Sequence, residues 1–305
     1  MTHPSMMLHS VSARLKWRNE RKKDQRLQDA GWYDLAARSQ LAPVFIGGCG
    51  RSGTTLFKEL LNRHSLCACG PETSLYGLPH NLQNISVPWD IDYDHLKTMQ
   101  QKSRNLIEFA DTFAMEFLRS EGKQIWVEKT PNNVRAIEKI LTWYPKGKFI
   151  HLIRDGRDVV CSLRHHPKER VKDGKIVPIK TTNSISKCAT RWLNDTMRGL
   201  AFKSHPRCLE VRYEALTETP EESLQRICRF IGIDFEPVML SGSGEKSRRS
   251  GQNMNNHNAS DNISAKSVAR WKTDLTATER EDFINIAGEL LIALGYAQDH
   301  SWAES

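Results

Sequence analysis

Short apolar runs alternate with stretches of helical periodicity along most of the chain. Four of these runs are typical of buried strands: 44–46, 125–127, 148–153 and 208–211. Apolar residues spaced three or four positions apart, together with local start signals, predict helices between and after these strands. They cover 54–63, 96–118, 132–143 and 184–204, and two more begin at 156 and 219. Thr276 and Glu279 form a capping-box pattern, which predicts a last helix ending at Gly295. This alternation predicts an α/β fold, in which helices cover both faces of a parallel sheet.

Polar segments divide the chain into an arm, one domain and an internal loop. Residues 1–40 are predicted to form a basic, partly helical arm, and residues 41–298 a single domain. Within the domain, the segment 71–94 contains three prolines and is interpreted as a loop. Residues 241–262 are dominated by serine, glycine, asparagine and charged side chains, which favours a mobile loop.

The composition is that of a globular protein with a basic surplus. The 305 residues carry a formal net charge of +8, and 39% of them are hydrophobic, enough for a substantial core. The charge alone suits nucleic acid, an anionic membrane or a small polyanion. No aromatic RNA-recognition motif accompanies it, so nucleic acid is not expected as a partner. No apolar run is long enough to predict a transmembrane helix, and the basic N-terminus lacks the apolar region of a secretory signal.

The seven cysteines are scattered along the predicted strands and helices. Their number is odd and their spacing irregular, which favours reduced thiols and a cytoplasmic location. Cys67 and Cys69 stand without a second pair of ligands at suitable spacing, so no metal site is predicted.

A glycine-rich turn joins the first strand to the first helix, with the sequence Gly48-Cys49-Gly50-Arg51-Ser52-Gly53-Thr54-Thr55. Glycines let a backbone approach a phosphate closely, and the N-terminus of the following helix directs free N–H groups at it. Gly48 and Gly53 have the spacing of a nucleotide-binding P-loop, but Thr54 replaces its lysine. Such a loop can hold a 5′-phosphate, with charge supplied by Arg51, yet it is poorly equipped to hydrolyse ATP.

A second candidate anion site follows the third strand, at Arg154-Asp155-Gly156-Arg157-Asp158. Arg154 stands at the carboxyl end of a predicted parallel strand, where α/β proteins bind ligands, and Ser162 lies two helical turns further on. An arginine and a hydroxyl group there suit a second phosphate, although a surface ion pair, either Arg154–Asp158 or Arg157–Asp155, would explain the same residues. Phosphates at two separate positions fit 3′-phosphoadenosine 5′-phosphosulfate (PAPS) better than ATP or NAD.

These residues resemble the PAPS-dependent sulfotransferase family, nearest to its tyrosylprotein and bacterial branches. The resemblance spans residues 43–296 and rests on six matches in the same order: Phe45-Ile46-Gly47-Gly48, Cys69-Gly70-x-Glu72-Thr73, Lys129-x-Pro131, Arg154-Asp155-Gly156-Arg157, Val211-x-Tyr213-Glu214 and Trp271. It implies a sulfotransferase fold built on a P-loop-type parallel sheet. It also implies an enzyme that transfers a sulfonate group from PAPS to a hydroxyl group of a glycan, a phenol or tyrosine, or another small molecule, and releases 3′-phosphoadenosine 5′-phosphate (PAP).

The same resemblance implies which residues bind the donor. The 5′-phosphosulfate is assigned to Arg51, Ser52, Gly53, Thr54 and Thr55. The 3′-phosphate is assigned to Arg154 and Ser162, with Arg270 close to it and Tyr213 lining the nucleotide pocket. The serine that assists the transition state in the family has no clear counterpart, because residues 253–267 do not align.

Two further residues are implied in catalysis. Lys129 resembles the family lysine that stabilises the leaving group. Pro131 occupies the position of the histidine base of cytosolic small-molecule sulfotransferases, so Glu72, which matches the glutamate of the tyrosylprotein branch, is the expected general base. Glu128 and His151 are reserve candidates for this role.

The sequence leaves open two other functions and the identity of the acceptor. The alternatives are a P-loop-type nucleotide kinase and a non-catalytic protein that binds polyanions. The acceptor is expected to contact residues 74–120 and 165–183, which offer Tyr76, Trp89, Tyr93, His165, His166 and Lys168. Arg51, Lys129 and Arg154 can neutralise the donor phosphates, so no divalent metal is expected. A homodimer is left open.

Overall fold

The computed structural model describes residues 31–76, 81–172, 175–179, 181–241 and 267–304. Most of the predicted basic arm and all of the predicted mobile loop except Ser241 lie outside these ranges. In the described part of the chain, no helix is long and apolar enough to cross a membrane.

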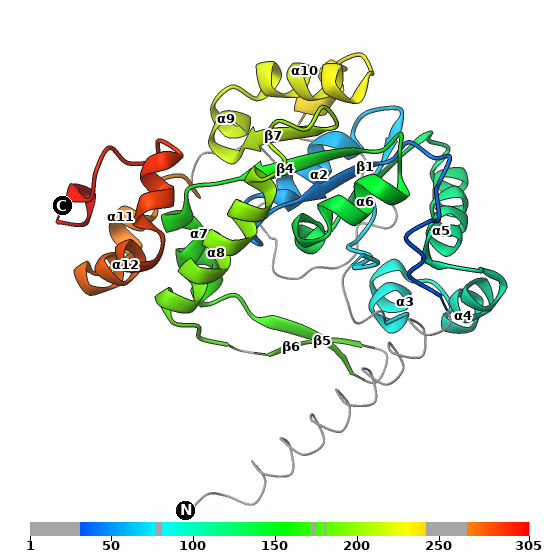
Figure 1. The fold of residues 1–305 in the computed structure, drawn as a ribbon, viewed down its shortest axis with the longest axis horizontal. Helices are drawn as coiled ribbons and strands as arrows, with labels where there is room; N and C mark the ends of the chain where they lie inside the picture. Colours follow the sequence, from blue (N-terminus) through cyan, green and yellow to red (C-terminus); the bar gives the residue numbers. More distant parts are fainter. Residues whose placement is uncertain (1–30, 77–80, 173–174, 180, 242–266, 305) are drawn as a thin grey trace, which may run out of the picture.

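A five-stranded parallel sheet lies at the centre of the molecule (Figure 1). Its strands run in the order β2 (Cys67–Ala68), β3 (Ile125–Lys129), β1 (Val44–Gly47), β4 (Lys148–Ile153) and β7 (Cys208–Arg212). Ile46 of β1 lies between Lys129 of β3 and Ile150 of β4 in the register. The four strands expected from the sequence are all present, and the predicted α/β fold is confirmed.

The helices of the described residues are α2 (Thr54–Asn62), α3 (Gln83–Trp89), α4 (Tyr93–Lys102), α5 (Leu106–Glu121), α6 (Ile137–Trp143), α7 (Gly156–Arg164), α8 (Ile185–Leu200), α9 (Tyr213–Glu218), α10 (Pro220–Ile231), α11 (Trp271–Asp274) and α12 (Ala277–Ala293). Short 3₁₀ turns occupy Pro131–Arg135, Pro237–Leu240 and Ser301–Ala303. The capping box of Thr276 and Glu279 is present at the start of α12.

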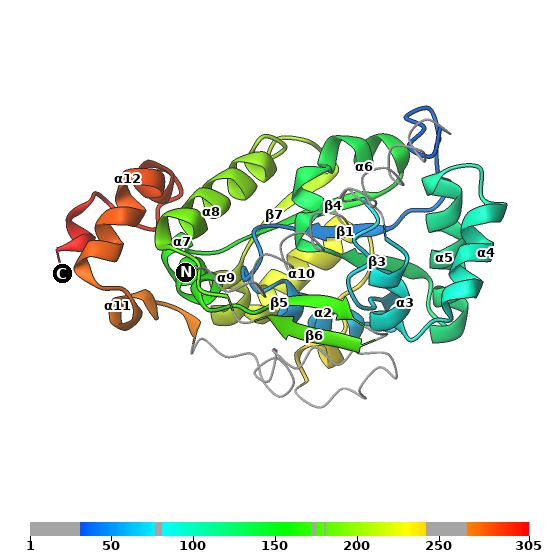
Figure 2. The same cartoon turned by 90° about the horizontal axis from the view of Figure 1, so that it is seen from below.

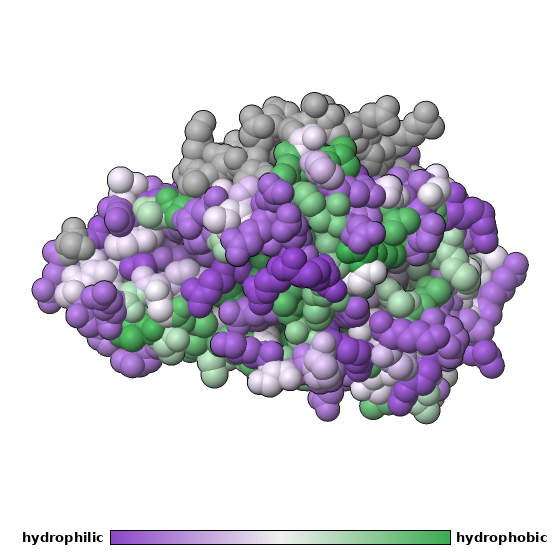
Figure 3. Space-filling view, turned by 90° about the horizontal axis from the view of Figure 1, so that it is seen from above, coloured by the Kyte–Doolittle hydropathy of each residue, from purple (hydrophilic) through white to green (hydrophobic). Residues whose placement is uncertain are grey.

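Helices cover both faces of the sheet (Figures 1 and 2). Strands β1, β3 and β4 are buried on both sides, so their apolar residues alternate between two cores, whereas the edge strand β7 is mostly half-buried. Phe45, Trp126 and Phe149 pack in the core that α5 and α6 share. Val44, Ile46 and Val127 point the other way and pack with α2 and α10. On the side of α9 and α10, the surface mixes hydrophilic side chains with scattered apolar groups (Figure 3).

Three sequence predictions of helices and loops are wrong. The single helix expected over 132–143 is a 3₁₀ turn, Pro131–Arg135, followed by α6. The single helix expected over 96–118 is two helices, because α4 ends at Lys102 and α5 begins after Asn105. The Asn105 side chain accepts hydrogen bonds from the N–H groups of Ile107 and Glu108, which makes it the N-cap of α5. The segment 71–94, interpreted as a loop, contains α3 and the first residues of α4.

A small antiparallel hairpin was also missed. It consists of β5 (Lys168–Lys172) and β6 (Lys175–Ile179), forms a sheet of its own and lies beside α3 (Figure 2).

Parallel strands bring all their carboxyl ends to one edge of the sheet. Gly48 follows β1, Glu72 lies four residues after β2, Lys129 ends β3, Arg154 follows β4 and Tyr213 follows β7. Residues far apart in the sequence, each with a predicted function, are therefore gathered at the same edge.

Candidate active site

The glycine-rich turn has the backbone conformation expected of an anion-binding loop. Arg51 and Gly53 both have positive φ, 75° and 91°. A side chain at position 53 is also excluded by space, because a Cβ there would lie 2.1 Å from Cδ2 of Tyr213. Thr54 begins α2, so the free N–H groups of the first helical turn point back into this loop.

Ser52 has a buried hydroxyl group at the centre of the turn. Among the described residues its Oγ atom has no hydrogen-bond partner. Burying a hydroxyl group without a partner costs about 1–3 kcal/mol, so such atoms are rare away from binding sites. The Ser52 hydroxyl therefore fits a loop that receives an anion.

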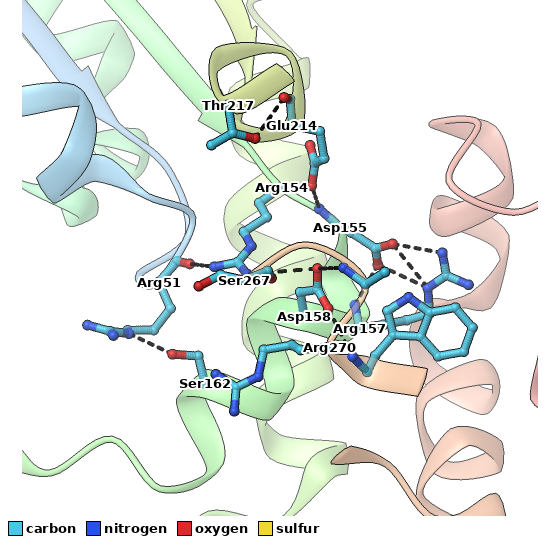
Figure 4. A network of polar contacts seen from close by, with 12 residues as sticks. Arg51, Arg154, Asp155, Arg157, Asp158, Ser162, Glu214, Thr217, Ser267 and Arg270 are labelled. Atoms are coloured by element: carbon cyan, nitrogen blue, oxygen red, sulfur yellow. Dashed lines mark hydrogen bonds and ion pairs between the residues drawn. The ribbon is translucent and has the colours of Figure 1, made fainter. Parts of the chain in front are cut away.

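Arg51 connects the glycine-rich turn with the second candidate anion site (Figure 4). Its Nε atom donates a hydrogen bond of 2.9 Å to Oγ of Ser162 in α7. Its carbonyl oxygen accepts a hydrogen bond of 3.1 Å from Nη1 of Arg154. The sequence assigned Arg51 to one phosphate and the other two residues to a second phosphate. In the structure the two sites are adjacent.

Arg154 is nearly buried and stacks on an aromatic ring. Its guanidinium carbon lies 4.5 Å from the ring centroid of Tyr213, the first residue of α9. The same tyrosine packs on Gly53, so it contacts both the turn and the arginine. The residues predicted to bind the sulfonate donor therefore include one connected group: Arg51, Gly53, Arg154, Ser162 and Tyr213.

Three arginine side chains at this edge repel one another. Burial lowers the pKa of Arg51 most, and the charges of Arg154 and Arg270 lower it further, while Glu72 acts in the opposite direction. Arg270 is partly neutralised, since its Nε atom donates a hydrogen bond of 2.7 Å to Asp274. A cluster of like charges that the fold holds together is a favourable place for an anion.

Glu72 and Lys129 form a direct ion pair beside this cluster. The Lys129 Nζ atom lies 2.6 Å from Oε1 of Glu72. The lysine side chain is only 3% exposed and the glutamate side chain 40%, so the pair is open to solvent on the glutamate side. The two residues predicted to carry catalysis are therefore in contact, with the carboxylate accessible to a second molecule.

Glu128, a reserve candidate for the base, has its carboxylate fully engaged inside the protein. Its Oε1 atom accepts hydrogen bonds of 2.7 Å from the hydroxyl groups of both Thr73 and Thr130, and Asn133 donates to its Oε2 atom. Burial raises the pKa of this carboxyl group, and these hydrogen bonds oppose the rise. Because Thr73 follows Glu72 and Thr130 follows Lys129, Glu128 connects the two backbone segments that carry the ion pair.

His151, the other reserve candidate, is a packed residue of β4. Its ring lies against Gly199 of α8, where a Cβ atom would come within 2.2 Å of Cε1. Burial lowers the pKa of His151 to about 4. The imidazole is therefore neutral at pH 7 and sits between the sheet and α8.

We expect His151 to make the protein sensitive to mild acid. In the unfolded chain His151 has the ordinary histidine pKa of 6.5, whereas in the folded protein burial lowers its pKa to about 4. The unfolded state binds more protons between these values, so stability falls as the pH is lowered through this window. From pH 7 to pH 5, the free energy of unfolding should fall by about 2 kcal/mol more in the wild type than in His151→Gln. Chemical denaturation at the two pH values measures this difference, and equal losses in both proteins would contradict it.

Two residues of the expected acceptor region belong to the core. Tyr76 donates a hydrogen bond of 2.8 Å from its hydroxyl group to that of Tyr144, and Trp89 packs between Phe113 and Phe117. Both are buried, so their assignment to an acceptor pocket is wrong. Tyr93 is 37% exposed, and the side chain of Lys168 lies outside the described residues.

Two basic side chains lie near the glycine-rich turn. Arg191 was missed in the sequence, and His166 was predicted only as part of the acceptor region. Arg191 of α8 lies over Gly50, with Nη2 at 3.1 Å from the place of a Cβ. Burial lowers the pKa of His166, and the charges of Arg51 and Arg191 lower it further, whereas Glu72 raises it. Nothing in the local sequence around Arg191 indicates this position, because α8 reaches the turn only through tertiary packing.

Comparisons with known proteins identify relatives of the chain. The model of the sulfotransferase family matches residues 43–237. A putative protein-tyrosine sulfotransferase of Caenorhabditis briggsae is 29% identical over 204 residues, which are 65% of this chain and 68% of that protein. Across the protein-tyrosine sulfotransferases that it matches, the chain spans from 51% to 81% of their own length.

Solved structures support the same fold. The sulfotransferase domain of the Synechococcus PCC 7002 olefin synthase has a TM-score of 0.58 and 21% identity, and the match covers 83% of this chain and 95% of that one. Mouse sulfotransferase SULT7A1 complexed with PAP has a TM-score of 0.53 and 12% identity, covering 85% and 88% of the two chains.

Proposed function

The chain belongs to the sulfotransferase family, and from this premise we propose that it transfers a sulfonate group from PAPS to a hydroxyl group of an acceptor. The acceptor oxygen attacks sulfur in line, and the bond between sulfur and the bridging oxygen of the 5′-phosphate breaks. A base takes the acceptor proton, and PAP leaves with the bridging oxygen. The protein must therefore hold two phosphates, accept one proton and stabilise one leaving oxygen.

The observation that carries the proposal is the contact of Arg51 with both Ser162 and Arg154. It joins a P-loop-like turn that lacks the usual lysine to a second basic site at the same edge of the sheet. Together they make one site for a nucleotide with two separated anionic groups. The solved relative complexed with PAP supports this choice of nucleotide.

The ion pair of Glu72 and Lys129 supplies the remaining chemistry. Glu72 is the accessible member and accepts the proton of the acceptor hydroxyl group. Lys129 is buried, and its ammonium group, a compact positive charge, stabilises the negative charge that develops on the leaving oxygen. Arg51, Lys129 and Arg154, together with backbone N–H groups, offset the charge of the donor, so we propose that no divalent metal takes part.

Ligand-dependent thermal stability separates this proposal from its alternatives. A ligand that binds only the folded protein raises the melting temperature. We expect PAP to stabilise the protein more than ATP or heparin. Stabilisation by ATP but not by PAP would point to a kinase, and stabilisation by heparin alone would point to a binder of polyanions.

We expect Arg51→Ala and Arg154→Ala each to weaken PAP binding at least tenfold. Each substitution removes a charge-assisted contact worth about 1.5–3 kcal/mol. Isothermal titration calorimetry measures the effect. Arg38→Ala provides the control, since Arg38 is an exposed arginine that donates hydrogen bonds to the carbonyl oxygens of Leu35 and Ala37 in its own segment. Unchanged affinity in Arg154→Ala would contradict the assignment of the second anion site.

The acceptor is proposed as a class, a molecule with a reactive hydroxyl group. The names of the relatives favour a phenol such as tyrosine, while the exposed carboxylate of Glu72 suits a glycan equally well. Radiolabelled PAPS offered with panels of phenols, tyrosine peptides and glycans, in the presence of EDTA, tests the acceptor and the metal together. Transfer that disappears in EDTA and returns with magnesium would overturn the metal-free mechanism.

A further inference from the structure

The buried carboxylate of Asp158 binds the backbone on both sides of Arg270 (Figure 4). It accepts hydrogen bonds of 2.9 Å from the N–H group of Ala269 and 3.1 Å from that of Trp271. The Asp158 side chain is 0% exposed, and it comes from α7, more than a hundred positions earlier in the chain. One carboxylate thus holds the two peptide groups between which Arg270 stands.

Neighbouring residues of the same motif hold the same segment, Ser267–Trp271. An Nη2 atom of Arg154 donates to the carbonyl oxygen of Ser267. The guanidinium group of Arg157 lies 4.0 Å from the ring centroid of Trp271. Asp155 in turn fixes Arg157, accepting a hydrogen bond of 2.7 Å from its Nη2 atom. The motif that supplies one predicted phosphate ligand, Arg154, therefore also docks a distant piece of chain.

A simple ion pair with Arg154 does not account for Asp158. The closest nitrogen of Arg154 lies 3.8 Å from the carboxylate, beyond hydrogen-bonding distance, whereas both backbone N–H groups are within it. Ala269 also has φ of 60°, in the left-handed region that costs an ordinary residue about 1 kcal/mol. The hydrogen bond from its N–H group to Asp158 offsets this cost and fixes the turn that carries Arg270.

Arg270 faces the nucleotide site as a result. Its charge acts on Arg51, and its position in the chain places it beside Ser267, which contacts Arg154. We propose that Asp158 is a positioning residue that sets Arg270 and the Ser267–Trp271 segment against the 3′-phosphate of the donor. Selectivity for that phosphate then depends on a carboxylate that never touches it. This inference rests on the proposed use of PAPS.

The affinities for PAP and AMP, which differ only in the 3′-phosphate, test the proposal. Asp158→Asn keeps the shape of the side chain but replaces one acceptor oxygen by a donor, so one of the two N–H groups loses its partner. We expect PAP affinity to fall at least tenfold in Asp158→Asn while AMP affinity changes less than twofold, as measured by isothermal titration calorimetry. Asp111→Asn is the control, since Asp111 is a partly buried aspartate of α5, and its ratio of PAP to AMP affinity should equal that of the wild type.

Arg270→Ala completes the experiment. This side chain is 41% exposed, so its removal should leave the fold intact even where Asp158→Asn fails to fold. We expect Arg270→Ala to lose most of the preference for PAP, and Asp158→Asn to change it little further in that background. An unchanged preference in Arg270→Ala, or fully additive losses in the double variant, would overturn the proposal. A wild-type protein that binds PAP no better than AMP would instead contradict the proposed function itself.

Discussion

Glu72→Gln is expected to lower kcat by about 10²–10⁴, the usual contribution of a positioned base. Glutamine keeps the size of the side chain and can still accept a hydrogen bond from Lys129, but it cannot take the proton of the acceptor. PAP affinity should stay within about twofold of the wild type, because the exposed carboxylate faces the acceptor. Turnover with saturating PAPS and calorimetric binding of PAP give the two quantities separately.

Glu59→Gln is the matched control for this substitution. Glu59 also forms an ion pair with a nearly buried lysine, Lys58, at 3.1 Å, but it belongs to α2 rather than to the edge of the sheet. Its replacement should leave kcat unchanged. A Glu72→Gln protein that folds normally and keeps near-full kcat at neutral pH would remove Glu72 from the mechanism. The buried positions of Glu128 and His151 would then make a solvent molecule the more reasonable proton acceptor.

Lys129→Ala should lower kcat by about 10²–10³ and weaken donor binding a few-fold. Its ammonium group is needed most when the leaving oxygen becomes charged, so the loss falls mainly on the chemical step. The partner carboxylate is 40% exposed and stays hydrated when the lysine is removed, so we expect the variant to fold. Steady-state kinetics against PAPS, together with the melting temperature, measure both effects.

Lys148→Ala is the control for Lys129→Ala, because it removes a lysine that supports the fold but lies away from the proposed site. Lys148 begins β4, whereas Lys129 ends β3, and its Nζ atom donates to the carbonyl oxygens of Phe230 and Ile231. Its removal should lower the melting temperature and leave kcat unchanged. Equal losses of kcat in Lys129→Ala and Lys148→Ala, at similar losses of melting temperature, would show that Lys129 only supports the fold.

Four of the five strands of the central sheet were predictable because each contains a short apolar run, whereas β2 has only two residues and was missed. The break between α4 and α5 was missed because the apolar periodicity continues across Ser103–Asn105. A local signal was present there, since asparagine followed three residues later by Glu108 is a helix-start pattern. The hairpin of β5 and β6 gave a weaker signal, because β5 is largely charged, β6 contains a proline and the hairpin adds no strand to the main sheet.

The candidate site was predictable where each residue is defined by its own strand end. The glycine-rich turn, Lys129 and Arg154 all follow recognisable strands, and the structure brings them to one edge. Contacts that depend on tertiary packing were not predictable, and Arg191 over Gly50 is one example. Asp158 is another, because an aspartate four residues after an arginine suggests a local ion pair, whereas its real partners are peptide groups near position 270.

The isolation of the β5–β6 hairpin has a consequence for how such proteins diverge. The hairpin shares no ladder with the central sheet and lies beside α3 (Figure 2). Insertions, deletions and substitutions in it leave the strand ends that carry the arginines and the ion pair undisturbed. If the hairpin contacts the acceptor, as the sequence predicts for residues 165–183, drift in it after gene duplication would change the acceptor while the use of the donor is inherited unchanged.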